Sequence, residues 1–144
     1  MSNLFFDIET IPDQREGALQ DHVDNIAAPA RYKKAESIQK WIEENGPDAA
    51  VEEWKKTALR GIAGQIVSIA WAFDDLPITG EIDATTKHNG EELLLCAFFE
   101  AIYRQHKSGE GKYQEITWIG HNCIDFDIRF LYQRAAILGI KPEF

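Results

Sequence analysis

Cysteine and long hydrophobic runs are both scarce in this chain of 144 residues. The two cysteines, Cys96 and Cys123, are too few for a disulfide framework and lack CxxC spacing, so we expect a reducing, cytoplasmic environment. The longest stretch without charge, from Gly61 to Phe73, is shorter than the roughly 20 residues that span a bilayer. Because Asp7 interrupts the apolar N-terminus and no basic residue precedes it, no secretory signal is expected. We therefore expect no membrane association.

Positive charge is also in short supply. Fifteen Lys and Arg stand against 24 Asp and Glu, which gives a formal net charge of −9. Binding to duplex DNA through a basic surface depends on neutralising phosphates, so this balance argues against that class of protein. It does not exclude a metal-dependent nuclease, whose active site is itself acidic. The length suits one domain, and 44% hydrophobic and 27% charged residues are ordinary globular values.

Strand-like and helix-like segments alternate along the chain, which predicts an α/β fold. Strands are expected at 3–9, 65–73 and 115–121, with a weaker one near 78–83; the apolar run 65–73 predicts a central strand covered on both faces. Helices are expected to start at the caps Asn89 and Asn122, and the second is expected to end at Gly139. Residues 13–60 are predicted to form a helical hairpin, with Gly46-Pro47 as its stop and start signals.

Asp7 and Glu9 lie two residues apart on the first predicted strand. Both carboxylates therefore leave the same face, with Cα atoms roughly 6 to 7 Å apart, while Phe6 and Ile8 are expected to be buried on the other face. This spacing suits a shared metal cluster at the end of a strand. The simpler interpretation is a pair of solvated carboxylates, because so short a motif often occurs by chance.

A second group of polar residues follows the strand at 115–121. The segment GHNCIDFDIRFL begins with the glycine turn at Gly120 and leads into a helix. Asn122 and Asp127 have simple structural interpretations here, as an N-cap and as a first-turn carboxylate favoured by the helix dipole. Phe126, Phe130 and Leu131 have helical spacing and are expected to be core residues.

Together the two motifs resemble the DEDD superfamily of 3′–5′ exonucleases. Asp7-Ile8-Glu9-Thr10 is similar to its first motif, and Asn122, Phe126, Asp127 and Leu131 are similar to its second, N-x3-F-D-x3-L. The closest resemblance is to predicted exonucleases similar to the proofreading domain of family B DNA polymerases. A haloacid-dehalogenase motif is not matched, because Glu9 replaces its second aspartate and the residue before the threonine is missing.

The resemblance implies a ribonuclease-H-like fold and hydrolysis of phosphodiester bonds at DNA 3′ ends, single-stranded ends being preferred. It implies two divalent cations, Mg²⁺ or Mn²⁺, that bind the scissile phosphate of an in-line displacement. Asp7, Glu9 and Asp127 would be the catalytic metal ligands, and Thr10 and Asn122 would contact the terminal nucleotide. RNA is an alternative substrate, because nothing in these motifs reads the 2′-hydroxyl.

The family's third motif, a Tyr or His shortly before a fourth carboxylate, is missing. Neither Y-x3-D nor H-x4-D occurs anywhere in the chain. We therefore expect a single exonuclease domain over residues 1–144 whose C-terminal part is cut short. A chain that ended here would leave buried surface open, which predicts self-association or a partner covering that side. The alternative is a catalytically incomplete module of the same fold that binds nucleic acid or a protein.

The resemblance implies that the helical hairpin at 13–60 is an insertion into the fold, and this insertion has a different charge balance from the rest of the chain. Between Arg31 and Arg60 it carries seven basic and six acidic residues. We interpret this difference as a hypothesis that the insertion guides substrate through Lys33, Lys34, Lys55 and Lys56, although interleaved charges are usual on a solvated helix.

Overall fold

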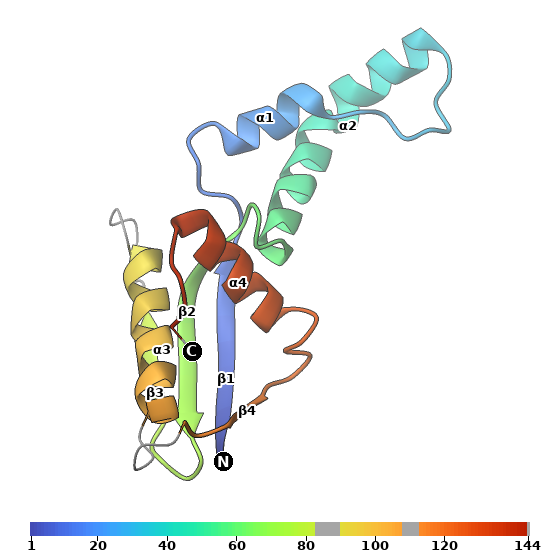
Figure 1. Ribbon diagram of the computed structural model, residues 1–144. Helices are drawn as coiled ribbons and strands as arrows, with labels where there is room; N and C mark the ends of the chain where they lie inside the picture. Colours follow the sequence, from blue (N-terminus) through green and yellow to red (C-terminus); the bar gives the residue numbers. More distant parts are fainter. Residues whose placement is uncertain (83–89, 108–112, 144) are drawn as a thin grey trace.

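A mixed four-stranded sheet forms the centre of the computed structural model, which describes residues 1–82, 90–107 and 113–143. In the sheet order β3-β2-β1-β4, β1 (Ser2–Ile11) pairs antiparallel with β2 (Gln65–Phe73) and parallel with β4 (Ile116–Ile119). The edge strand β3 (Thr79–Ile82) pairs antiparallel with β2. Helices α3 (Gly90–Lys107) and α4 (Asp127–Leu138) lie on one face of this sheet (Figure 1). The predicted α/β class is confirmed.

The core lies between this sheet and the two helices. Along β1 the side chains alternate strictly, and Leu4, Phe6 and Ile8 point into the core. Strand β2 contributes Ile66, Ile69, Trp71 and Phe73, which pack against Leu94, Leu95, Phe98 and Ile102 of α3 and Phe130, Leu131 and Ala135 of α4. The period-2 and helical patterns of the sequence therefore meet in one apolar layer.

The other face of the sheet is open among the residues that the structure describes. Phe5 of β1 remains 43% exposed and Ile119 of β4 37% exposed, and Ala70 of β2 is exposed between them and β3. The prediction that β2 is covered on both faces is therefore wrong. The side chains of β2 on the open face are mostly small. The apolar run at 65–73 therefore does not tell whether one or both faces of the strand are covered.

Helix α4 follows a turn that differs from the predicted cap. Phe126, not Asn122, is the residue before the helix, and Asn122 adopts a left-handed conformation with φ 50°. Asn tolerates this conformation better than most residues, which accounts for its place in the turn. Gly139 ends α4 in a left-handed conformation with φ 73°, as predicted. The predicted cap Asn89 lies outside the described residues.

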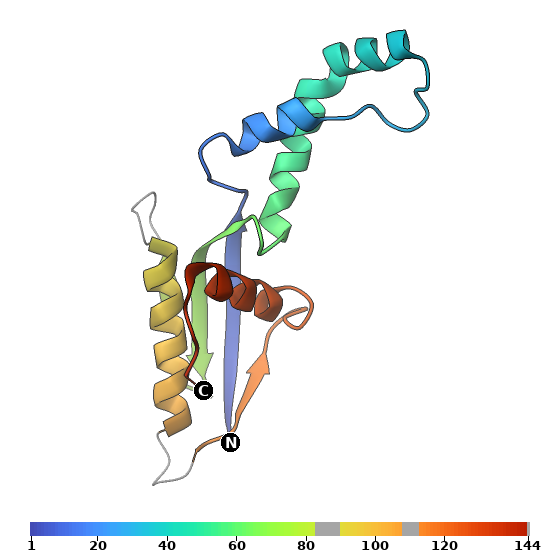
Figure 2. The same cartoon turned by 45° about the horizontal axis from the view of Figure 1, so that its top comes forward.

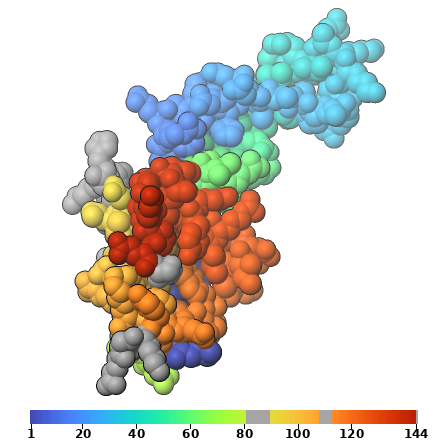
Figure 3. Space-filling view, viewed as in Figure 1, coloured from blue at the N-terminus to red at the C-terminus, as the bar shows by residue number. Residues whose placement is uncertain are grey.

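Between β1 and β2 the chain forms a long projection, which we call the arm (residues 18–55). It consists of α1 (Ala18–Asn25) and α2 (Ala35–Lys55), and it extends away from the sheet in Figures 1, 2 and 3. Gly46-Pro47 does not divide two helices as predicted, because α2 is continuous through both residues. A Cβ at Gly46 would lie 3.4 Å from Ile26 Cγ2, so this glycine permits close packing of the residue that follows α1. Figure 2 shows that α2 bends along its length, as expected of a helix containing proline.

The arm is fixed to the end of β1 by what we call the arm root (Thr10, Asp13, Trp54, Thr57 and Ala58). Thr10 Oγ1 donates a hydrogen bond to the Ala58 carbonyl at 2.7 Å, and the Asp13 amide donates to Thr57 Oγ1 at 2.8 Å. Trp54 Nε1 donates to the Asp13 carbonyl at 2.9 Å. These contacts, with the 3-10 helix η1 (Lys56–Leu59), return the chain to the sheet beside the strand that carries Asp7 and Glu9.

Within the described ranges, no helix combines the length and the apolar character needed to cross a membrane.

Candidate metal site beside the central strand

Asp7 and Glu9 occupy the open face of β1. Both side chains are exposed, while the residues between and before them, Ile8 and Phe6, are 5% and 6% exposed. The predicted separation of the acidic and apolar faces is confirmed. Glu9 pairs with Ser68 but Thr10 pairs with Ile66, so β2 contains one extra residue, Val67, at this point. Such bulges redirect neighbouring side chains and are common beside active sites.

Asp127 reaches the same strand from the other motif. Strand β4 pairs with β1 only as far as Phe5 and Ile119, and the chain then turns away at Gly120. A Cβ on Gly120 would lie 3.0 Å from the Phe6 carbonyl oxygen and 2.9 Å from Cys123 Cβ, so a side chain here would force the turn away from β1. The glycine allows the turn to pack closely and bring the first residue of α4 to the edge of β1.

Asp127 is buried, with only 4% of its surface exposed. Burial raises the pKa of its carboxyl, and the negative charge of Asp7 raises it further. Hydrogen bonds from its own backbone N–H and from that of Ile8 lower the pKa in part, as does the nearby His121. The pKa of Asp127 remains above its ordinary value of 3.8. The two motifs therefore place one exposed and one buried carboxylate within electrostatic reach of each other.

A divalent cation would find part of a ligand set here. Carboxylate oxygens are the ligands that Mg²⁺ and Mn²⁺ prefer, and a cation between Asp7 and Asp127 would relieve their repulsion. However, no group of three or more His, Cys, Asp or Glu in the described part of the chain is arranged to hold a metal ion. The structure thus holds Asp127 beside Ile8 of β1, while Asp7 and Glu9 share the open face of that strand, and the three do not form a cluster among the described residues.

The two predicted substrate contacts lie on either side of these carboxylates. The hydroxyl of Thr10 is half-buried and donates to Ala58 in the arm root. Asn122 is exposed in the turn before α4, and its carbonyl accepts a hydrogen bond from the Phe126 amide at 3.2 Å. Each residue therefore has a structural role in shaping the site, and nucleotide contact remains a prediction for both.

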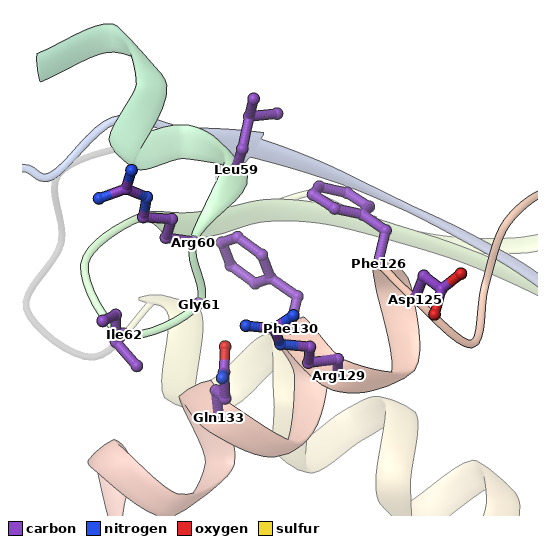
Figure 4. A pocket seen from close by; sticks show the side chains of 9 residues that line it. All are labelled: Leu59, Arg60, Gly61, Ile62, Asp125, Phe126, Arg129, Phe130 and Gln133. Carbon is purple, nitrogen blue, oxygen red and sulfur yellow. The ribbon is translucent and has the colours of Figure 1, made fainter. Parts of the chain in front are cut away.

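A shallow pocket of about 150 Å³ lies next to this site, between α4 and the segment that follows the arm. Phe126 and Phe130 form part of its wall, and Arg60 and Arg129 bring positive charge to it (Figure 4). Arg129 extends toward Gly61 and Gln133, whereas Arg60 points away from α4. Sequence reasoning missed this pocket because only the folded arm brings residues 59–62 next to α4. The one local signal was a basic residue two positions after Asp127.

Comparisons of the chain with protein-family models, with curated proteins and with solved structures found no match.

Proposed function

We propose that this protein is a metal-dependent 3′–5′ exonuclease of the DEDD type, with a ribonuclease-H-like fold, acting on DNA ends and preferring single strands. The observation that carries the proposal is the position of Asp127, whose carboxylate accepts a hydrogen bond from the backbone N–H of Ile8, the residue after Asp7. These residues belong to two motifs at opposite ends of the sequence, and a chance match would not require them to be neighbours. Glu9 shares the open face of β1 with Asp7 and is the third carboxylate of the two motifs.

The chemistry of the site follows from the positions of its carboxylates. Exposed Asp7 and Glu9 are accessible to solvated cations, and buried Asp127 is oriented by the Ile8 backbone N–H. When bound, divalent cations supply polarisation of the scissile phosphate and stabilisation of the attacking and leaving oxygens. Asp7, Glu9 and Asp127 would hold those cations, and the terminal phosphate would lie between β1 and the start of α4.

A second candidate function is a binding module that lacks catalysis. Two observations favour it: the sequence has no third motif, and no cluster of three ligands is found among the described residues. Titration with Mn²⁺ separates the two functions. Two coupled binding sites support the enzyme, and the absence of binding supports the module.

The direct test is hydrolysis of a 5′-labelled single-stranded DNA in Mn²⁺, followed as a ladder that shortens from the 3′ end. Asp7→Asn is expected to reduce the rate at least about 100-fold, since even residues that only support a metal ligand contribute about 10- to 100-fold. Its melting temperature is expected to stay close to that of the wild type, because Asp7 is exposed and fills no core volume.

Asp75→Asn is the matched control. Asp75 is also an exposed aspartate, but it follows β2 at the opposite end of the sheet. The Asp75→Asn variant is expected to hydrolyse DNA at the wild-type rate. Equal rates for Asp7→Asn and wild type would overturn the proposed site, and a wild type that cleaves no DNA in either Mg²⁺ or Mn²⁺ would favour the binding module.

A further inference from the structure

The basic residues of the arm fall into two groups that differ in their surroundings. Along α2 and at the start of η1, which together we call the shaft (residues 35–56), each lysine has a carboxylate partner one turn away. Lys55 Nζ lies 2.8 Å from Glu52, Lys56 Nζ 2.6 Å from Glu53, and Lys40 Nζ 3.7 Å from Glu44. Residues 35–56 contain three lysines and six acidic residues, a net charge of −3, so each shaft lysine is paired and the shaft as a whole is acidic.

The second group lies in the loop between α1 and α2, which we call the arm tip (Arg31, Tyr32, Lys33 and Lys34). Its three cations are exposed, and no carboxylate of the described residues lies within 4.0 Å of them. Arg31 lies 5.1 Å from the centre of the Tyr32 ring, and Tyr32 also packs against Trp41. The Tyr32 ring is thus occupied by its contacts with Arg31 and Trp41. We therefore expect the arm tip to bind a ligand through its positive charges and not by stacking on a base.

The position of these cations is unfavourable for the helix itself. Lys34 is the N-cap of α2, with Lys33 beside it, so both lie at the positive end of the helix dipole. Cations destabilise this end of a helix, whereas anions stabilise it. Helix stability therefore does not explain why these cations lie here. A bound anion would offset their repulsion from the helix dipole.

The charge of the whole chain makes the arm tip distinctive. Residues 26–34 contain three basic residues and no acidic residue, a net charge of +3, so the rest of the chain carries −12. An extended polyanion is repelled by most of this surface and attracted to the tip.

The arm holds the tip at a defined reach from the candidate metal site. A helix rises 1.5 Å per residue, so the 21 residues of α2 extend up to about 30 Å from the arm root. The arm root includes Thr10, the residue after Glu9, which donates to the Ala58 carbonyl. At the duplex rise of 3.4 Å per nucleotide, about nine stacked nucleotides cover this distance.

We propose that the arm tip binds the backbone phosphates of a nucleic-acid strand whose 3′ end lies at Asp7 and Asp127, up to about 30 Å away. This inference rests on the proposed function and assigns the path of its substrate. Contact is made through Arg31, Lys33 and Lys34 and is independent of base sequence. Lys55 and Lys56, which charge alone suggested as substrate contacts, are excluded because their carboxylate partners already neutralise them.

The experiment compares two triple variants that change the net charge equally. The tip variant is Arg31→Gln, Lys33→Gln and Lys34→Gln; the control is Lys40→Gln, Lys55→Gln and Lys56→Gln. Each is titrated by fluorescence anisotropy, in Ca²⁺ to prevent cleavage, with a trinucleotide spanning about 10 Å and with a strand of about 30 nucleotides. Circular dichroism checks that the helices are retained.

The tip variant is expected to bind the long strand at least about tenfold more weakly than wild type. The slope of log K against log salt concentration is expected to be smaller in magnitude by about two. The trinucleotide is expected to bind as tightly as it does to wild type. The control is expected to match wild type on both. Equal losses in both variants, or a loss on both lengths, would overturn the inference, as would polyglutamate competing as well as DNA. These outcomes concern binding, so they are separate from the Asp7→Asn hydrolysis test of the metal site.

Discussion

Among single residues, Asp127 has an environment far from that of an ordinary surface carboxylate. It is 4% exposed, and burial together with the charge of Asp7 raises its pKa above 3.8. A carboxyl whose pKa is higher in the folded than in the unfolded protein binds its proton more tightly when folded. Its contribution to stability is therefore greatest at low pH and is lost as the pH rises from the unfolded to the folded pKa.

Asp127→Asn is accordingly expected to increase the free energy of unfolding at pH 7 in a metal-free buffer while it reduces hydrolysis. The amide retains an oxygen that can accept the Ile8 N–H but carries no charge. The gain over wild type is expected to shrink as the pH falls toward 3.8, where the wild-type carboxyl becomes protonated. Urea unfolding in EDTA at several pH values measures this difference.

Asp125→Asn is the control for this prediction, because Asp125 is exposed in the same turn. Its stability is expected to follow that of the wild type across the pH range. A loss of stability in Asp127→Asn at pH 7 would show that the buried negative charge is compensated in the metal-free protein.

The sequence predicted part of this site from periodicity alone. A strand places Asp7 and Glu9 on one face, and that expectation is confirmed. The burial of Asp127 could not be predicted in this way. It depends on where β4 leaves the sheet, on the left-handed turn at Asn122 and on the close approach of Gly120 to Phe6.

At the scale of elements, an ion pair joins α3, α4 and β2. Arg134 of α4 donates from Nε and Nη2 to the two carboxylate oxygens of Glu91 in α3, at 2.8 and 2.7 Å. Glu91 Oε1 also accepts the Ile66 amide of β2 at 2.8 Å. The two side chains are only 13% and 7% exposed, so the pair has little access to water.

Arg134→Met is expected to destabilise the fold by about 3 kcal/mol or more, because it leaves the Glu91 carboxylate buried without its cation. Arg104→Met is the control, since Arg104 forms a pair with Glu100 on α3 in which the side chains are 77% and 51% exposed. Breaking that exposed pair is expected to cost about 0 to 1 kcal/mol. Urea unfolding measures both, and similar small losses would mean that Glu91 is rehydrated when Arg134 is removed.

Element boundaries show where local sequence rules fail. The spans of β1 and β2 and the end of α4 follow the predicted segments closely, because each has an unambiguous apolar pattern. The observed helices of the arm differ from the predicted ones, because the local sequence Gly46-Pro47 is typical of a break between two helices. Packing of Ile26 against Gly46 and the continuous α2 override that local preference.

At the scale of the whole molecule, the proposed path for nucleic acid requires the arm and the sheet to behave as one body. Gly64 lies where the chain passes from the arm root into β2. A Cβ at this position would lie 2.6 Å from the Thr57 carbonyl oxygen and 3.1 Å from the Ile11 carbonyl oxygen. Because both contacts are backbone atoms, from the arm root and from β1, neither can move without separating the arm from the sheet.

Gly64→Ala is therefore expected to destabilise the protein by about 1 to 3 kcal/mol, the typical cost of forcing extra volume into a packed region. Gly80→Ala is the matched control, because nothing lies within 4 Å of a Cβ at Gly80, and its stability is expected to be unchanged or slightly higher. Urea unfolding followed by tryptophan fluorescence reports on Trp54 in the arm root and Trp71 in the core together. One shifted transition is expected if the arm and sheet unfold together. Two separate transitions would mean that the arm moves independently and that its tip has no fixed reach from the metal site.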